Sequence, residues 1–230
     1  MPRIIDKLLA VLTLLVLLPL FVPIIIILLL TGEHKVFYLQ NRVGYKNKNF
    51  KIIKFVTMLA NSSNMGTGSL TLKNDPRVLP FGSFLRKSKI NELPQILNII
   101  IGDLAIVGPR PQMQIDFEKY SEELQQKIYN IRPGLTGIGS IVFRDEESLI
   151  SEASERENPH DFYKRVIAPY KGELEMWYQI NRSVFLDCKL IFMTAWAIIK
   201  PETRLYEKWF SNLQKEIFNS EFKKKSCKRI

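Results

Sequence analysis

The sequence predicts a mainly helical α+β protein in which an N-terminal membrane helix hairpin precedes a small β-hairpin and a membrane-associated helical domain. Residues 8–30 carry no charged side chain over 23 positions, long enough to enter or cross the hydrocarbon core of a bilayer, which is about 30 Å thick. Residues 36–43 and 50–55 alternate apolar and polar side chains around a polar turn, as two paired strands do. Helical patterns dominate from residue 90 onward, so the sheet is expected to be small.

The apolar segment predicts a helix that enters the membrane, bends and returns to the same face. Pro19 and Pro23 remove backbone hydrogen bonds where no water can replace them, which favours a bend at Pro19. Lys and Arg flank both ends of the segment, and basic flanks tend to stay in the cytoplasm. A helix that simply spans the bilayer is the alternative. A cleaved secretory signal is disfavoured, because the run is long and no small-residue cleavage site follows it.

The charge balance favours anionic partners. The chain has 33 Lys and Arg against 23 Asp and Glu, a net charge of +10. Lipid headgroups and phosphorylated substrates are expected to bind, whereas no nucleic-acid motif is recognisable and nucleic acid is not a predicted partner. Cys188 and Cys227 have neither metal-ligand nor disulfide spacing, which suits a reducing cytoplasm. Residues 201–230 form a basic tail that is expected to be solvated or to touch anionic lipid.

A long loop and four helices are expected in the remainder. Residues 61–77 are rich in Ser, Asn and Gly and predict a loop that is either functional or merely flexible. The helices are expected at residues 90–101, 117–130, 159–180 and 184–199. In the first of these, Pro94 is tolerated only in the first turn, and Gly102 ends the helix. Asn91 and Glu92 should therefore lie at its N-terminus, where free N–H groups and the helix dipole favour anions.

Three blocks of sequence stand out by their length and composition. The first contains RIIDKLLAV, LLPLFVP, VFYLQNRVG and FKIIKFVTM, the second is NDPRVLPFGSFLRKSKINELPQILNIIIGDLAIVGPRPQ, and the third is RPGLTGIGSIVFR. Together they resemble the bacterial sugar transferases, the monotopic polyprenol-phosphate phosphoglycosyl transferases. The resemblance extends over roughly residues 3–200, and the length of the second block makes chance agreement very improbable.

This resemblance implies a specific activity and organisation. Such enzymes move a sugar phosphate from a UDP-sugar to polyprenol (undecaprenyl) phosphate with release of UMP, and so initiate capsule, O-antigen, exopolysaccharide or glycoprotein glycan assembly. It implies a re-entrant membrane segment at residues 1–31, broken at the position of Pro19, a catalytic sugar transferase domain at residues 32–200, and a need for Mg²⁺. The expected location is the cytoplasmic face of the bacterial inner membrane, in contact with lipid, and a homodimer is possible.

Candidate phosphate clamps are the cationic side chains of the matched blocks. Transfer between two anionic partners requires cations that neutralise the repulsion between phosphates. Arg110 lies between Pro109 and Pro111, which fix its backbone for bidentate contact with a phosphate. Each cation alone is more often a surface charge, but matched family positions favour a binding role. These cations are Arg110, Arg86 and Arg144, and less firmly Lys54 and Arg132.

Asn91 departs from the family pattern. The pattern is Asp-Glu-Leu-Pro-Gln, whose Asp is interpreted as the nucleophile that forms a covalent phosphosugar intermediate, whereas this chain has Asn91-Glu92-Leu93-Pro94-Gln95. A neutral amide is a poor nucleophile, so an aspartyl phosphate cannot form there. Three alternatives remain: Glu92 acts as nucleophile or metal ligand, polyprenol phosphate attacks directly while Asn91 positions it, or the protein is catalytically inactive. The first two are favoured, because the other site residues are present.

Further departures and weaker candidates complete the prediction. Leu18 precedes Pro19 where many members have Ser, and Val56 stands where many have Arg, which suggests a distinct branch of the family. Asp103 is a second, weaker candidate metal ligand beside Glu92. The three acidic residues 145–147 either bind metal or sugar hydroxyls or form a solvated turn. The competing functions are an inactive scaffold that binds UDP-sugar or polyprenol phosphate, and a basic module that only reads anionic lipid.

Overall fold

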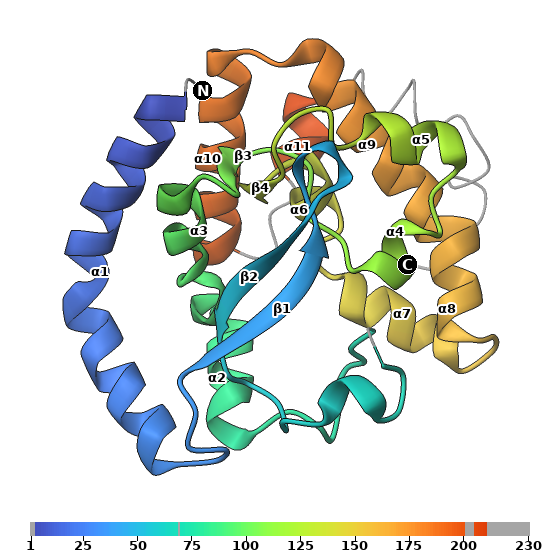
Figure 1. The fold of residues 1–230 in the computed structure, drawn as a ribbon. Coiled ribbons are helices and arrows are strands. Elements are labelled where there is room, and N and C mark those ends of the chain that lie inside the picture. Colours follow the sequence, from blue (N-terminus) through green and yellow to red (C-terminus); the bar gives the residue numbers. More distant parts are fainter. Residues whose placement is uncertain (1–2, 69, 201–204, 211–230) are drawn as a thin grey trace.

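The computed structural model describes residues 3–68, 70–200 and 205–210, and it is mainly helical with two small sheets (Figure 1). The strands are β1 (Phe37–Val43), β2 (Asn49–Phe55), β3 (Ala105–Val107) and β4 (Gly134–Thr136). The helices are α1 (Arg3–Leu30), α2 (Pro80–Lys87), α3 (Gln95–Ile101), α4 (Gln114–Phe117), α5 (Glu122–Lys127), α6 (Ile138–Val142), α7 (Glu146–Ser154), α8 (Pro159–Phe162), α9 (Ala168–Asn181), α10 (Val184–Ile199) and α11 (Leu205–Trp209). The predicted fold class is thus confirmed in its mainly helical α+β composition.

α1 is one continuous helix of 28 residues, and Pro19 and Pro23 both lie inside it. The predicted break at Pro19 into two half-helices is therefore not present. Instead the helix is bowed, with its concave side toward the rest of the chain (Figure 1). A proline inside a helix removes one hydrogen bond and pushes the preceding turn outward, which can bend the axis without ending the helix. The return of this segment to the same membrane face stays a prediction.

α1 packs on the folded domain along one narrow stripe. Its buried residues are Asp6, Ala10, Phe21, Ile24 and Leu28, which recur at intervals that place them on one face of a helix. The N-terminal half packs near α3, and the C-terminal half packs near β2 and α2. The opposite face is apolar and exposed, and in the most apolar 18-residue window only 17% is buried. By length and composition α1 can cross a membrane.

The predicted β-hairpin is confirmed. β1 and β2 pair antiparallel from Phe37 opposite Phe55 to Val43 opposite Asn49. The free edge of β2 is closed by Asn98 of α3, whose side chain accepts from the Ile53 N–H (3.0 Å) and donates to the Lys51 carbonyl (2.8 Å). Because Asn98 is buried, both ends of its amide need such partners, and they fix α3 against the strand that carries Lys54.

The predicted loop at residues 61–77 is irregular apart from one 3₁₀ turn, and it is held together by Arg77. This buried guanidinium donates to Asp75 and to the backbone carbonyls of Ser62, Met65 and Leu70 (2.7–2.8 Å), and to that of Gly68 at 2.9 Å. Charge-assisted bonds of this kind are among the stronger ones in proteins. The loop is therefore ordered by one side chain.

The predicted helix at residues 90–101 is shorter than expected. Ile90–Glu92 form a 3₁₀ turn, Pro94 is the N-cap of α3, and Gly102 ends α3 with φ of 106°. Pro94 has no N–H to continue a helix from the preceding turn, so the α-helix begins only after it. Asn91 and Glu92 consequently lie in a tight turn before α3. Lys89, which precedes this turn, has a left-handed φ of 60°.

The main core lies among the helices that follow β3. Two further expectations are met there: residues 159–180 are helical through α8, a π-turn at Tyr163–Ile167 and α9, and residues 184–199 form α10. The predicted single helix at residues 117–130 is wrong, because the chain breaks at Ser121, whose hydroxyl caps the start of α5. The parallel pair β3 and β4 was not predicted. Most of the predicted basic tail at residues 201–230 lies outside the described residues.

Candidate active site

Glu92 lies at the centre of a cluster of cations drawn from three parts of the chain. Its carboxylate accepts from Arg110 Nη2 at 2.7 Å, and Lys54 Nζ lies 3.6 Å from the same oxygen. Glu92 comes from the 3₁₀ turn before α3, Lys54 from β2, and Arg110 from the segment after β3. The three side chains are between 14% and 29% exposed, so the cluster is sheltered but reachable. The structure thus joins three residues that the sequence predicted as a site.

Glu92 stays ionised in this setting. Burial alone raises the pKa of its carboxyl, but the charges of Arg110 and Lys54 outweigh burial and hold the pKa well below its usual range. In return, Glu92 raises the pKa of Arg110. A carboxylate that is charged at neutral pH can attack phosphorus or hold a cation. An anionic ligand that enters the cluster has to compete with Glu92 for Arg110 and Lys54.

Lys54 is the most easily discharged cation of the cluster. Burial lowers the pKa of its ammonium to about 7, with Glu92 opposing and the nearby Arg42, Arg110 and Arg86 reinforcing the shift. Arg42 is a fourth cation that the sequence did not single out. It donates to Gln40 (2.6 Å) and to the Pro111 carbonyl (3.2 Å). Arg42 thereby contacts the segment that carries Arg110.

The backbone of Arg110 is held from two sides in addition to its prolines. The Arg110 N–H donates to Glu175 Oε1 (3.3 Å), and the Tyr129 hydroxyl donates to the Arg110 carbonyl (2.9 Å) while accepting from the Gln112 N–H (2.9 Å). Glu175 and Tyr129 are both almost fully buried. Burial raises the pKa of Glu175 to about 7, although the Arg110 N–H and the charge of Lys171 oppose the shift. Fixed backbone contacts of this kind preorganise a ligand clamp.

Arg86 lies between the cluster and α7, whereas Arg144 forms no hydrogen bond or ion pair with Glu92, Arg110 or Lys54 among the described residues. Arg86 pairs with Glu147 of α7 and contributes to the positive potential at Lys54. Glu146 pairs with buried Lys171 at 2.7 Å. Two of the three acidic residues at 145–147 are therefore occupied by protein cations rather than left free for metal. Arg144 directly precedes this segment and is half-buried.

Asn91 is buried beside Glu92, and its side-chain oxygen has no hydrogen-bond partner among the described residues. A buried acceptor without a partner is commonly satisfied by an ion or a water molecule. Mg²⁺ prefers oxygen ligands and is usually held by one or two carboxylates together with substrate phosphates. The Asn91 amide oxygen and the Glu92 carboxylate fit that donor set. No group of three or more His, Cys, Asp or Glu side chains gathers for a metal within the described residues.

Asp103, the weaker predicted metal ligand, does not join Glu92. It follows Gly102 at the C-terminal end of α3, whereas Glu92 precedes the N-terminal end. The intervening seven-residue helix alone is about 10 Å long at 1.5 Å per residue. The helix predicted at residues 90–101 already separates these two carboxylates, so the expectation that Asp103 assists Glu92 conflicted with the predicted secondary structure.

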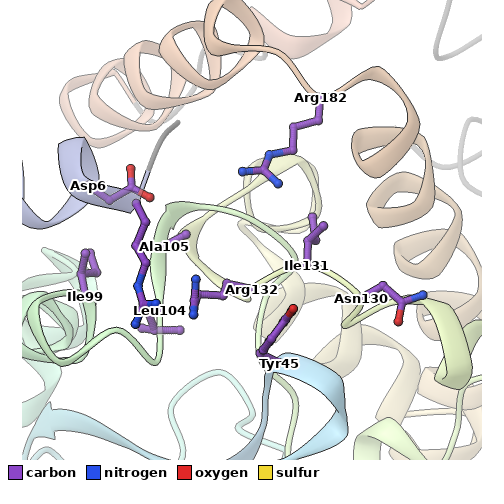
Figure 2. Close-up of a pocket in the computed structure, with 10 residues that line it drawn as sticks. Asp6, Tyr45, Ile99, Leu104, Ala105, Asn130, Ile131, Arg132 and Arg182 are labelled. Carbon is purple, nitrogen blue, oxygen red and sulfur yellow. The ribbon is translucent and has the colours of Figure 1, made fainter.

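Arg132 also lies elsewhere. It lines a cavity of about 210 Å³ together with Arg3, Asp6, Tyr45 and Arg182, and its guanidinium lies over the Tyr45 ring at 5.2 Å (Figure 2). Within the described part of the chain, Arg132 forms no hydrogen bond or ion pair with Glu92, Arg110 or Lys54. The predicted role of Arg132 as a clamp in the Glu92 cluster is therefore not supported.

Three contributors to the site were not predicted: Arg42, Tyr129 and Glu175. Arg42 was visible only as one of several basic residues after the apolar segment. Tyr129 and Glu175 lie in helical patterns, where a tyrosine or glutamate usually packs or faces solvent. Their positions depend on contacts 19 and 65 residues away in sequence, which no local pattern contains.

Comparison with known proteins agrees with this geometry. The family model described as "Bacterial sugar transferase" matches residues 1–201. An exopolysaccharide production protein, ExoY, of Sinorhizobium fredii is 36% identical over 84% of this chain and 83% of its own length. A UDP-glucose:undecaprenyl-phosphate glucose-1-phosphate transferase of Xanthomonas campestris is 33% identical over 86% of this chain.

That Xanthomonas relative is much longer, and the match spans 38% of its length. A UDP-N-acetylgalactosamine-undecaprenyl-phosphate N-acetylgalactosaminephosphotransferase of Aeromonas hydrophila is 31% identical over 79% of this chain and 40% of its own length. The match to the family model extends over α1 and the whole Glu92 cluster. The chain therefore belongs to the bacterial sugar transferase family.

Proposed function

We propose that this protein transfers a sugar phosphate from a UDP-sugar to polyprenol (undecaprenyl) phosphate and releases UMP. The observation that carries the proposal is the ionised Glu92 carboxylate held between Arg110 and Lys54. Relatives whose names describe this kind of transfer match 86% and 79% of this chain. A cluster of fixed cations suits a reaction in which a diphosphate and a lipid phosphate must approach each other.

Arg110 and Lys54 supply the electrostatic part of the reaction. When the diphosphate of the donor enters the cluster, its oxygens replace Glu92 as the partners of these cations. Arg110 can bind two phosphate oxygens with its planar fork, and Lys54 acts as a point charge. The phosphorus that carries the sugar is then open to attack, and its bond to the bridging oxygen breaks, so that UMP leaves with that oxygen and its electron pair.

Glu92 is our candidate for the attacking group. Its release from Arg110 and Lys54 provides a charged carboxylate beside the bound diphosphate, and attack on phosphorus gives a glutamyl phosphosugar. Polyprenol phosphate then attacks the same phosphorus, forms the diphosphate of the lipid product and returns the carboxylate. Direct attack by polyprenol phosphate on the UDP-sugar is the alternative, in which Glu92 and Asn91 only position the donor.

Mg²⁺ is proposed as the cofactor, held by Glu92 and the Asn91 amide oxygen together with donor phosphates. When bound, the ion supplies further neutralisation of phosphate charge. The support is the side-chain oxygen of Asn91, the residue before Glu92, which is buried and has no hydrogen-bond partner among the described residues. Because Asn91 contributes a neutral ligand, the protein donors carry a single negative charge.

We further propose that α1 lies in the cytoplasmic leaflet region of the bacterial inner membrane and does not cross to the other face. Both ends of α1 contact the folded domain: Lys7 donates to the Ile101 carbonyl (3.4 Å), and Gly32, just beyond the helix, lies against Leu79. A helix that crosses the bilayer perpendicularly leaves its domain at one end. The exposed apolar outer face of α1 would then be covered by lipid.

The deciding experiment is an assay of the purified full chain in detergent with Mg²⁺, polyprenol phosphate and a panel of UDP-sugars. UMP release that depends on both substrates is expected for at least one donor. A folded sample that binds UDP-sugar and releases no UMP with any donor would instead indicate a non-catalytic scaffold. UMP release in a single turnover without polyprenol phosphate would indicate the covalent route through Glu92, and its absence would indicate direct transfer.

A further inference from the structure

The cavity beside the N-terminal end of α1 is separate from the Glu92 cluster and is strongly cationic. Its lining includes three arginines from distant parts of the chain, which are Arg3 of α1, Arg132 before β4 and Arg182 after α9. Figure 2 shows the guanidinium groups of Arg132 and Arg182 directed into the cavity from two sides, with Asp6 on a third. At about 210 Å³, the cavity is larger than one water molecule requires.

The described residues that line this cavity carry more positive than negative charge. Asp6 is the one carboxylate in the lining, against three guanidinium groups, and one of its oxygens has no hydrogen-bond partner among the described residues. Arg3, Arg132 and Arg182 form no ion pair with another described residue. Asp187 lies near Asp6 but does not line the cavity. Like charges that converge on one space repel unless an anion binds between them.

The neighbouring groups favour a phosphate over a carboxylate ligand. Three guanidinium groups offer many N–H donors in planar forks, which suit the several oxygens of a phosphate ester. Tyr45 and Asn130 add neutral polar side chains to the lining, while Ile99, Leu104 and Ile131 add apolar surface that can contact the organic part of an ester. The lining therefore combines cationic and apolar side chains.

We propose that this cavity is a second phosphate site, which binds a phosphate ester independently of the Glu92 cluster. Two sources supply that chemistry: the headgroup of an anionic phospholipid, which the position beside α1 places within reach, and a soluble phosphorylated molecule. Arg132 and Arg182 provide the main contacts, and Arg3 closes the site from α1. Binding would also tie the N-terminal end of α1 to the two segments that carry Arg132 and Arg182.

The test compares thermal unfolding of the full chain in lipid nanodiscs of two compositions, phosphatidylcholine alone and phosphatidylcholine with phosphatidylglycerol. Sodium pyrophosphate added to the phosphatidylcholine discs is the soluble arm, measured in an Arg110→Ala background so that the Glu92 cluster contributes little. Saturation of the site is expected to raise the unfolding midpoint by about 5 °C in at least one arm. The double variant Arg132→Gln/Arg182→Gln is expected to lose that rise.

The matched control is Lys87→Gln/Arg156→Gln, which removes the same charge from two exposed positions outside the cavity. It should keep the rise. The variant Arg132→Lys/Arg182→Lys keeps the charge without the planar forks and should keep part of it, which separates binding from any folding defect of the Gln variant.

A rise only with phosphatidylglycerol identifies a lipid headgroup, a rise only with pyrophosphate identifies a soluble ligand, and rises in both support a general phosphate ester site. The proposal is overturned if neither arm raises the midpoint. It is also overturned if the Arg132→Gln/Arg182→Gln variant responds as the unsubstituted chain does.

Discussion

The two cationic regions of this molecule differ in how their charge is balanced. In the Glu92 cluster, Arg110 and Lys54 share one buried carboxylate, and Arg86 is paired with Glu147. In the cavity beside α1, three arginines and a single carboxylate, Asp6, form the charged lining, and none of the three arginines has an ion pair with a described residue. Both regions have more cations than carboxylates, but Arg110, Lys54 and Arg86 in the first are held in ion pairs, whereas the three arginines of the second pair with no carboxylate among the described residues.

Because the charge is paired in one region and unpaired in the other, we expect a bound phosphate to act differently in each. In the Glu92 cluster an incoming phosphate displaces a carboxylate, so that binding and the release of a reactive group occur together. In the cavity a phosphate only fills an unbalanced space, so binding carries no chemistry. We therefore expect the Glu92 cluster to turn over its phosphate substrates and the cavity beside α1 only to bind a phosphate. Substitutions in the Glu92 cluster test this expectation.

Glu92→Gln should abolish turnover, with UMP release reduced by at least about 1,000-fold. The amide can neither attack phosphorus nor carry charge, and it leaves Arg110 and Lys54 without a counter-charge. Glu152→Gln, at an exposed position on α7, is the matched control and should retain activity. Normal UMP release by Glu92→Gln would remove Glu92 from the chemistry.

Arg110→Ala should lower kcat/KM for the UDP-sugar about 100-fold while membrane association stays unchanged. In the proposed mechanism the lost guanidinium contacts the donor phosphates, whereas α1 is proposed to hold the chain at lipid. Co-sedimentation with vesicles measures the second property beside the assay. Equal loss of both would point to misfolding, and Arg156→Ala provides the exposed arginine control.

The pH profile of kcat/KM should have a narrow maximum near pH 7. Burial lowers the pKa of Lys54 to about 7, so a cation that holds phosphate is lost above that pH. Burial raises the pKa of Glu175 to about 7, so below that pH its carboxyl is protonated and accepts less well from the Arg110 N–H. Lys54→Arg should extend activity to higher pH, and Glu175→Gln should remove the acidic limb. An unchanged profile in both variants would exclude these assignments.

Tyr129→Phe should reduce kcat/KM only several-fold and lower the free energy of unfolding by about 1–2 kcal/mol. The change removes the hydroxyl that joins the Arg110 carbonyl to the Gln112 N–H, but it leaves the buried ring in place. Chemical denaturation and the UMP assay measure the two effects. A full loss of activity in a stable variant would give Tyr129 a direct role.

Asn91→Asp should keep or raise activity, the smallest effect expected here. A second carboxylate in the same turn adds charge for a metal and offers another nucleophile, and the surrounding cations can accommodate it. Loss of UMP release in this variant would show that the amide itself is required, for example to position polyprenol phosphate in direct transfer.

Much of this site could be predicted from the sequence because its main residues lie in distinctive blocks. Glu92, Arg110 and Lys54 were expected together, and they do meet. Asp103 lies beyond the far end of α3, which the predicted helix at residues 90–101 already implied, whereas no pattern in the sequence reveals that Arg132 lines a different cavity. Tyr129 and Glu175 act through long-range contacts with the Arg110 backbone and left no local signal.

The fold was predictable to a similar degree and for similar reasons. Alternation identified β1 and β2, and apolar runs identified α1 and α10. The strands β3 and β4 were not predicted, because each has only three residues, too few to show an alternating pattern of apolar and polar side chains. The predicted break in α1 depended on prolines, whose effect on a helix axis varies with the contacts that support the turn around them.

The hydrogen bonds of Arg77 to the loop at residues 61–77 affect which substitutions the loop can accept. Four of its acceptors are backbone carbonyls, which every amino acid carries, so the shape of residues 61–77 does not depend on most of the side chains there. Substitutions at the other positions of the loop can therefore alter what it presents to a ligand while its path is retained. Arg77 and Asp75 thus hold the backbone of the loop in place while the side chains exposed on it can change.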